Sequence, residues 1–251
     1  MTERMDTEKI LSKILEIGEG MLTCGGEVSR VEDSITRLCR AYQMKEINVF
    51  TITESIVVTV TDAAGQVLTQ TRRVGKYKTD FIKLEKFNEL SRRICSMPVP
   101  VGKLSEEISR IEGRQEYGTG EDILAYVLVS GAFSIFFGGS IRDGIAASLV
   151  GVFLYVLVGI TRRLEMNYIV SNLLCSFFGG GAAVLLYKLG IAQSVDKVII
   201  GNIMLLIPGI NLTNSIRDMI NGDLISGMNR LCEAVLAAIA LSLGFTITLL
   251  V

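Results

Sequence analysis

Five long stretches almost without charge constrain the fold more than any other feature of this sequence. They occupy residues 123–141, 144–161, 166–187, 198–216 and 231–251. A helix of about 20 apolar residues crosses the ~30 Å hydrocarbon core of a bilayer, and each stretch is close to that length. Only the last contains an acidic residue, Glu233, near its start. The pattern therefore predicts five transmembrane helices.

The charges are distributed unevenly, and their distribution separates two domains. The chain has 251 residues, with 25 Lys and Arg, 26 Asp and Glu, and a net charge of −1. Residues 122–251 hold only seven basic and seven acidic residues, which leaves 18 and 19 in residues 1–121. The predicted fold class is a polytopic α-helical membrane protein: residues 1–121 form a soluble cytoplasmic α+β domain, and residues 122–251 form the transmembrane domain.

The charged front half alternates between helical and strand periodicity. Gly25-Gly26 separates a first helix from a second that begins near Glu27. β-Branched residues then favour strands. The predicted elements are, in chain order, two helices within 5–42, strands between 47 and 74 with a turn at 62–65, helices at about 80–96 and 103–112, and a polar hinge at 115–122.

The absence of histidine removes whole classes of chemistry. It excludes a Ser-His-Asp triad, a Cys-His pair, imidazole metal ligation and a histidine pH switch. We expect no metal and no other cofactor. A near-neutral charge without a basic run argues against a nucleic-acid partner. An intramembrane enzyme has only Asp218 and Asp223 in its favour, so we expect no enzyme activity.

The N-terminus, the charged domain and the cysteines indicate the cellular compartment of residues 1–121. The N-terminus is charged from its start, which argues against a cleavable signal peptide. A large charged domain without a signal sequence stays in the cytoplasm, which places Arg217 and Arg230 on the cytoplasmic side. Five cysteines without C-x-x-C spacing favour reduced thiols over a disulfide framework.

Small residues are frequent in the apolar half. They include Gly138-Gly139-Ser140, Ala147 with Gly151, and the triplet Gly179-Gly180-Gly181. In lipid, such residues let helix backbones approach closely, so helix packing is the favoured interpretation. For the glycine triplet an alternative stays open, in which a freed backbone lines a water-filled cavity.

The fourth apolar stretch differs from the others because Pro208-Gly209 falls in its middle. At a rise of ~1.5 Å per residue from Val198, Pro208 lies about halfway across the bilayer. Proline removes a backbone donor, so a kink or break is expected there. A polar stripe follows at helical spacing, formed by Asn211, then Asn214 or Ser215, then Asp218. Exposing such a stripe to lipid would cost free energy.

A broken helix with polar groups near the midplane is a common form of transporter substrate site. Arg217 is suited to clamp a carboxylate. The alternative is an ordinary kinked span whose polar residues form a cytoplasmic loop, and the sequence supports both about equally. Asn211, Thr213 and Asn214 are hydrogen-bonding candidates, and any proton coupling would use Asp143, Asp218, Asp223 or Glu233. The predicted transport-path residues are Pro208, Gly209, Asn211, Thr213, Asn214, Arg217, Asp218, Asp223, Arg230 and Glu233.

A charged helix face in the front half is a second candidate. Glu27, Arg30, Asp33, Ser34 and Arg37 share one face of the predicted second helix. Exposed ion pairs alone explain such a face, and a docking or gating surface is the functional alternative. Between the first two spans, Arg142-Asp143 favours a short outer loop with an adjacent ion pair. The candidate gating or docking residues are Glu27, Arg30, Glu32, Arg142 and Asp143.

Two segments carry a resemblance to a known family. GGEVSRVEDSITRLCRAY (residues 25–42) and PGINLTNSIRDMINGDLISGMNRLCEAVL (residues 208–236) resemble the threonine/serine exporter family. The resemblance runs along essentially the whole chain and matches the larger, N-terminal part of that family. Its motif positions here are Glu27, Arg30, Glu32, Pro208, Gly209, Asn214, Arg217, Asp218, Gly222, Asp223 and Arg230.

The resemblance implies export of small polar metabolites across a bacterial inner membrane, with coupling to the proton motive force. One-chain members handle threonine and serine, and split members are linked with succinate and similar dicarboxylates. This chain resembles the larger subunit of a split exporter, with a small five-span membrane protein as partner and an oligomeric assembly. A membrane-anchored sensor, whose α+β domain binds a ligand, is the alternative function.

Overall fold

The structure is a computed structural model that describes residues 2–75, 78–114 and 118–250. The predicted hinge at 115–122 falls partly outside these residues. The chain divides into two compact units. The first unit comprises Met1–Gln115 and Thr213–Arg230, and the second comprises Glu116–Leu212 and Leu231–Val251. Nothing in the sequence pattern indicated that residues 213–230 group with the N-terminal residues.

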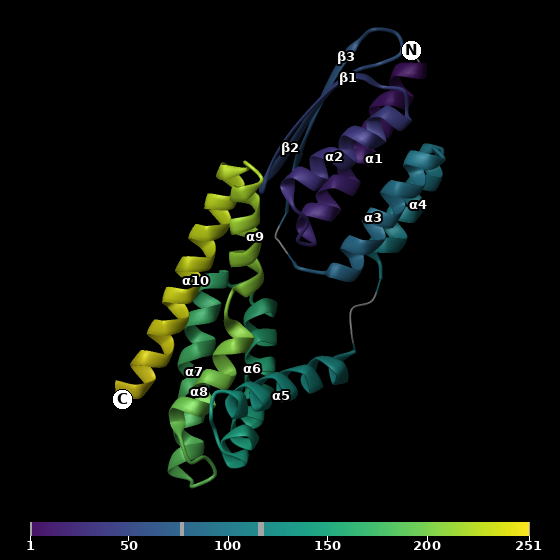
Figure 1. Cartoon of the computed structure of the whole chain (residues 1–251). Coiled ribbons are helices and arrows are strands. Elements are labelled where there is room, and N and C mark those ends of the chain that lie inside the picture. The colour runs from purple at the N-terminus through teal and green to yellow at the C-terminus, as the bar shows by residue number, and fades with distance from the viewer. Residues whose placement is uncertain (1, 76–77, 115–117, 251) are drawn as a thin grey trace. The chain divides into compact units, whose positions relative to one another are not determined.

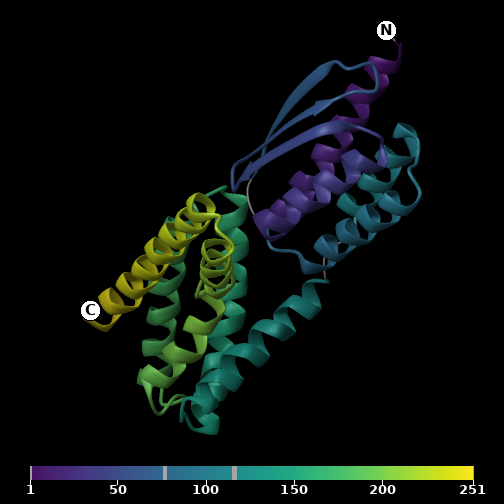
Figure 2. The same ribbon diagram turned by 45° about the horizontal axis from the view of Figure 1, so that its top comes forward.

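The N-terminal part of the first unit is an α+β fold in three layers. A sheet of order β1-β2-β3 with antiparallel neighbours packs on one side of the pair α1 and α2, and α3 and α4 pack on the other side (Figure 1, Figure 2). The elements are α1 (Thr2–Thr23), α2 (Val28–Ala41), β1 (Lys45–Ile52), β2 (Ser55–Thr61), β3 (Val67–Arg73), α3 (Phe81–Ser96) and α4 (Val101–Glu112).

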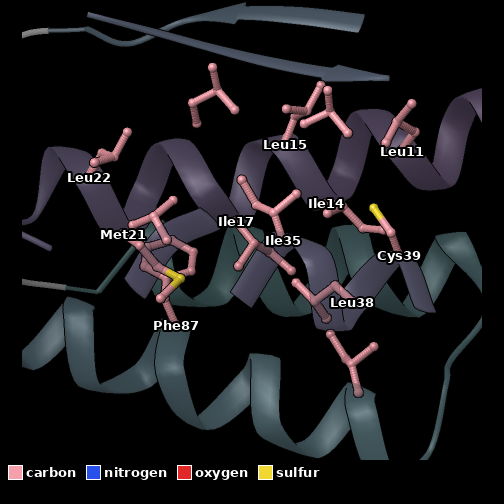
Figure 3. Packing of buried hydrophobic residues seen from close by; sticks show 14 of the residues in the cluster. Leu11, Ile14, Leu15, Ile17, Met21, Leu22, Ile35, Leu38, Cys39 and Phe87 are labelled. Carbon is pink, nitrogen blue, oxygen red and sulfur yellow. The ribbon is translucent and has the colours of Figure 1, made fainter. Parts of the chain in front are cut away.

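The core of this fold lies on both sides of α1. Figure 3 shows Leu11, Leu15 and Leu22 on the strand side of α1, and Phe87 of α3 meeting Met21 on the other side. These residues are at most 1% exposed. Apolar residues at helical spacing on both faces of α1 therefore produce the three-layer arrangement.

Local signals in the sequence set several element boundaries as predicted. Asp80 caps α3 by accepting bonds from the backbone N–H groups of residues 82 and 83. The predicted turn at 62–65 joins β2 to β3, with Gly65 at φ +79°. Helix α4 begins at Val101, directly after Pro100 and two residues before the predicted start. All five cysteines are free thiols.

The second unit contains the apolar helices. They are α5 (Thr119–Phe136), α6 (Ile141–Arg163), α7 (Tyr168–Lys188), α8 (Val195–Leu206), the start of α9 (Gly209–Ile220) and most of α10 (Leu224–Leu250). Among the described residues, α5, α6, α7 and α10 are long and apolar enough to cross a membrane, and the pair α8–α9 is a fifth candidate if it counts as one broken span. The chain is thus a multi-pass membrane protein, with α10 starting seven residues before the predicted span.

Small residues bring the backbones of these helices together, as predicted for helix packing in lipid. A Cβ on Gly131 of α5 would lie 3.2 Å from the carbonyl oxygen of Gly144 in α6. A Cβ on Gly151 of α6 would lie 2.9 Å from the carbonyl oxygen of residue 126 in α5. Ala147 is fully buried in the same unit.

Two of the small-residue predictions take a different form. Helix α7 runs unbroken through the glycine triplet, so the alternative of a freed backbone there is wrong. Gly179 faces Leu154 of α6, and Gly180 faces Thr248 of α10. The stretch 138–140 is a turn, because Gly138 ends α5 at φ +90° and the next residues start α6. Gly139 still allows a close approach, because a Cβ there would lie 3.1 Å from Cβ of Lys197 in α8.

Candidate functional site

The predicted break at Pro208-Gly209 is present as a bend of 51° between α8 and α9. Pro208 is buried, and the helical bonds resume at once when the N–H of residue 212 donates to its carbonyl oxygen at 3.0 Å. Of the polar residues after the break, Asn211 is half-buried and Thr213 is exposed. The span is therefore broken by proline's missing donor, and its second half is a short polar helix.

Helices α9 and α10 form a tight hairpin, which we define as residues 213–230. Gly222 ends α9 at φ +96°, and the N–H of Asp223 donates to the carbonyl oxygen of Asp218 at 2.9 Å. This is a Schellman ending, which requires a residue with a left-handed conformation. A Cβ on Gly227 would lie 2.8 Å from the carbonyl oxygen of Ser215, so the two helices touch.

The hairpin contains a fully buried ion pair. Asp218 is 0% exposed, and its Oδ2 lies 3.4 Å from Nε of Arg230, whose side chain is 7% exposed. Arg230 also donates from Nη2 to the carbonyl oxygen of Gly26 at 3.2 Å. The guanidinium thus joins α9 and α10 to the Gly25-Gly26 turn of the N-terminal fold.

Carboxylates from outside its own segment lie near the N-terminus of α2. Glu27 occupies the N-cap position but makes no side-chain capping bond, and the first turn of α2 has no acidic residue. The carboxylate of Asp218 faces the backbone N–H of Val28, and that of Asp223 faces the N–H of Ser29. Two hairpin carboxylates therefore supply the negative charge that a helix N-terminus favours.

Glu27 instead points its carboxylate at two arginines. Its Oε1 accepts from Nη1 of Arg217 at 2.8 Å, and its Oε2 lies 3.4 Å from Nε of Arg30. The Glu27 side chain is 13% exposed and that of Arg217 is 51% exposed. The two sequence motifs, far apart in the chain, thus meet in one charge cluster, which consists of Glu27, Arg30, Glu32, Arg217, Asp218, Asp223 and Arg230.

Neutral contacts surround this charge cluster. Asn214 Nδ2 lies 3.5 Å from the carbonyl oxygen of Gly25, and Asn221 Nδ2 donates to Oγ of Ser29 at 3.4 Å. Gly26 has no room for a side chain, because a Cβ would lie 2.7 Å from the carbonyl oxygen of Met21. Gly26 therefore allows this turn to pack closely against the end of α1.

The two carboxyl groups of the cluster that are raised in pKa outside the candidate spans are those of Asp223 and Glu32. Burial raises the pKa of Asp223, and the N–H of Ser29 opposes that shift. Burial also raises the pKa of Glu32, the nearby charge of Asp223 adds to the increase, and the N–H of Thr51, which donates to Glu32 at 2.7 Å, opposes it. These acids hold protons more tightly than exposed carboxyls do.

The remaining predicted residues belong to the second unit and are outside the charge cluster. Glu233 is exposed on α10, and Arg142 is exposed at the start of α6. Asp143 is 1% exposed and accepts bonds from the N–H groups of Ser140, Gln193 and Ser194 at 2.7–2.9 Å. The expected ion pair with Arg142 is wrong, because Asp143 instead ties the α5–α6 turn to the α7–α8 turn.

The contribution of Ser29, Asn221 and the carbonyl groups of Gly25-Gly26 was missed from the sequence. One signal was present: a double glycine before a helix whose N-cap position holds Glu, a residue outside the preferred capping types. Within the described residues, no group of three Asp, Glu or Cys has a geometry suited to a metal ion. The chemistry available is carboxylate binding by the half-exposed Arg217 and proton binding by buried carboxyls.

The chain is similar to known exporters along nearly its whole length. A family model described as "Putative threonine/serine exporter" matches residues 12–251. A "Probable threonine/serine exporter" of Mycobacterium tuberculosis is 25% identical over 98% of this chain and 46% of its own length. A "Threonine/serine exporter" of Corynebacterium glutamicum is 20% identical over 94% of this chain and 50% of its own length.

This chain spans about half the length of these curated relatives. No solved structure matches it. The family model covers the α+β fold, the broken span and the hairpin alike. By that coverage, the chain belongs to the threonine/serine exporter family.

Proposed function

We propose that this chain is a subunit of an exporter that moves small carboxylate-bearing metabolites, such as threonine, serine or succinate-like dicarboxylates, out of the cell. The observation that carries the proposal is the broken span α8–α9, whose polar second half bears Arg217 beyond a 51° bend. Broken spans of this kind form substrate sites in secondary transporters. Family membership supports the export of amino acids in particular.

Arg217 is the proposed carboxylate ligand. It is half-exposed, so its guanidinium is reachable by a small solute, and an arginine can hold a carboxylate by two parallel bonds. Asn211, Thr213 and Asn214 precede it on the same helix and are proposed to bind the amine or hydroxyl group of the metabolite. Selectivity between amino acids and dicarboxylates then depends on these neighbours, because both kinds of solute present a carboxylate.

Proton coupling is proposed to use the buried acids near Arg217. Asp218 is fully buried against Arg230, and Asp223 lies next to it at the hairpin turn. A carboxyl in such a site can change its protonation state when its partners move, which links proton uptake to conformation. Without histidine, such carboxyls are the side chains suited to this task near neutral pH.

The proposed setting is a bacterial inner membrane, with the N-terminal α+β fold in the cytoplasm. Because the chain resembles the larger subunit of split members of the family, we propose that a small five-span membrane protein is its partner and that the two assemble as a hetero-oligomer. The exposed apolar side chains of the candidate spans would face lipid or that partner.

Metabolite efflux from cells that express this chain with such a partner tests the proposal. We expect threonine or succinate efflux that is lost in Arg217→Ala and strongly reduced in Asp218→Asn. Glu89→Gln, which removes an exposed carboxylate of α3, is the matched control and should leave efflux unchanged. Normal efflux in both site variants at equal protein levels would refute the assignment of these residues.

A further inference from the structure

The carboxylate of Glu27 lies where a metabolite carboxylate would bind. In the structure Arg217, the proposed carboxylate ligand, already binds a carboxylate, and that carboxylate comes from the N-terminal α+β fold. We propose that Glu27 is an internal competitor: a small carboxylate solute displaces it from Arg217, Glu27 then stays paired with Arg30, and the hairpin loses one of its ties to α2. This inference rests on the proposed function of Arg217.

The contact between Glu27 and Arg217 is suited to displacement. It joins one guanidinium nitrogen, Nη1, to one carboxylate oxygen, Oε1, at 2.8 Å. A guanidinium carries five N–H donors in a planar fork, and a free carboxylate can take two of them in parallel. Because half of the Arg217 side chain is exposed, a solute can approach the fork from the side that Glu27 does not cover.

Arg30 gives Glu27 a second cationic partner that remains after Arg217 is lost. The Glu27 side chain is 13% exposed, so leaving its charge without a partner would be unfavourable. Its second oxygen, Oε2, already lies 3.4 Å from Nε of Arg30, three residues further along the same helix. When a solute takes Arg217, Glu27 therefore keeps a cationic partner, and no buried charge is left uncompensated.

The exchange loosens the hairpin without releasing it. The buried Asp218–Arg230 pair and the bond from Arg230 to Gly26 do not involve Glu27. Arg217 stands on α9, and α9 continues directly from the break of the span. Occupation of Arg217 by a solute is thereby coupled to the strength with which α9 is held by the N-terminal fold.

The first test measures binding of L-threonine and of succinate to the purified full chain. Removing the competitor in Glu27→Gln should lower the dissociation constant about 2- to 5-fold, as expected for loss of a half-exposed ion pair. Arg217→Gln should abolish binding, and Glu89→Gln should match the wild type. L-Threoninamide, which lacks the carboxylate, should not bind through Arg217.

The second test follows the hairpin directly, first with Glu27 in place and then with Glu27→Gln. Ser29 and Asn221, whose side chains meet at 3.4 Å, are replaced by cysteine and joined by a short bifunctional thiol reagent. The background carries Cys95→Ser and Cys232→Ser, because these are the least buried native thiols. Threonine or succinate should lower the cross-linking yield, threoninamide should not, and adding Glu27→Gln should lower the yield without any solute.

The outcomes separate this inference from the proposed function. Binding that needs Arg217 but is unchanged in Glu27→Gln, with a cross-linking yield that no carboxylate alters, overturns the competitor and leaves the exporter standing. If a carboxylate lowers the cross-linking yield but cells show no efflux, the export function is refuted and the role of Glu27 as a competitor is supported. If carboxylates change neither the cross-linking yield nor the efflux from cells, both the competitor and the export function are overturned.

Discussion

Arg230 and Arg217 stand on the same hairpin, yet their replacement by methionine should have very different effects on stability. Arg230 is buried against Asp218, which is 0% exposed. Arg217 is 51% exposed, and its partner Glu27 is also paired with another arginine. Methionine keeps much of the length of the arginine side chain, so the comparison isolates the charge.

The expected magnitudes follow from burial. Removing Arg230 leaves the Asp218 charge buried and uncompensated and takes a donor from the Gly26 carbonyl, which costs about 3–5 kcal/mol. Removing Arg217 breaks one half-exposed pair, which costs about 0.2–1 kcal/mol. For a chain of this size, 1 kcal/mol shifts the melting temperature by about 2–4 °C. Arg230→Met should therefore lower it by about 6–20 °C, and Arg217→Met by no more than about 4 °C.

Thermal unfolding of the purified full chain in detergent, at one fixed scan rate, measures both variants. The double variant Asp218→Asn/Arg230→Met is the decisive control, because it removes both charges of the pair and keeps an amide oxygen near the N–H of Val28. It should recover most of the loss seen in Arg230→Met. Equal melting temperatures for the two single variants, or a double variant no more stable than Arg230→Met, would refute the buried-pair interpretation.

Three further predictions concern other contacts, each measured by the same unfolding assay. Gly26→Ala should destabilise by about 1–3 kcal/mol because its methyl group would overlap a carbonyl of α1, whereas Gly102→Ala, at a position with open space, should be neutral or slightly stabilising. Burial raises the pKa of Asp223 in the folded state, so the folded state binds this proton more tightly than the unfolded state does. The free energy of unfolding of the wild type should therefore fall as pH rises from the ordinary carboxyl range through the raised pKa. Asp223→Asn should make this fall less steep. Asp143→Ala should cost about 3 kcal/mol by leaving its buried donors without an acceptor, while Arg142→Ala, exposed beside it, should change stability by less than about 0.5 kcal/mol.

Much of the fold followed from local patterns. The apolar stretches located the candidate spans because hydrocarbon thickness fixes the length of a helix that crosses it. Pro208 located the break, because the residue itself lacks the donor that a continuous helix needs. The start of α3 near residue 80 and the turn at 62–65 were predictable for the same reason: each depends on a few neighbouring residues.

The interpretation of the charges was less complete. From the sequence, Asp218 belonged to a polar stripe of one span, Arg217 was a separate candidate to clamp a carboxylate, and Glu27 and Arg30 belonged to a charged helix face. The structure joins Arg217 to Glu27, a pair separated by 190 positions in the chain. Helical spacing shows which residues share a face, but it carries no information about what that face meets.

A charged α+β region and a multi-pass apolar region with a break at Pro208 follow from the amino-acid sequence alone. Those properties come from composition and from contacts between near neighbours. The tertiary structure adds that the hairpin at residues 213–230 groups with the N-terminal fold and that Asp218 and Asp223 lie near the first N–H groups of α2. The first N–H groups of a helix need acceptors, and a buried carboxylate needs donors or a cation. Folding brings these two kinds of group together from distant segments of the chain.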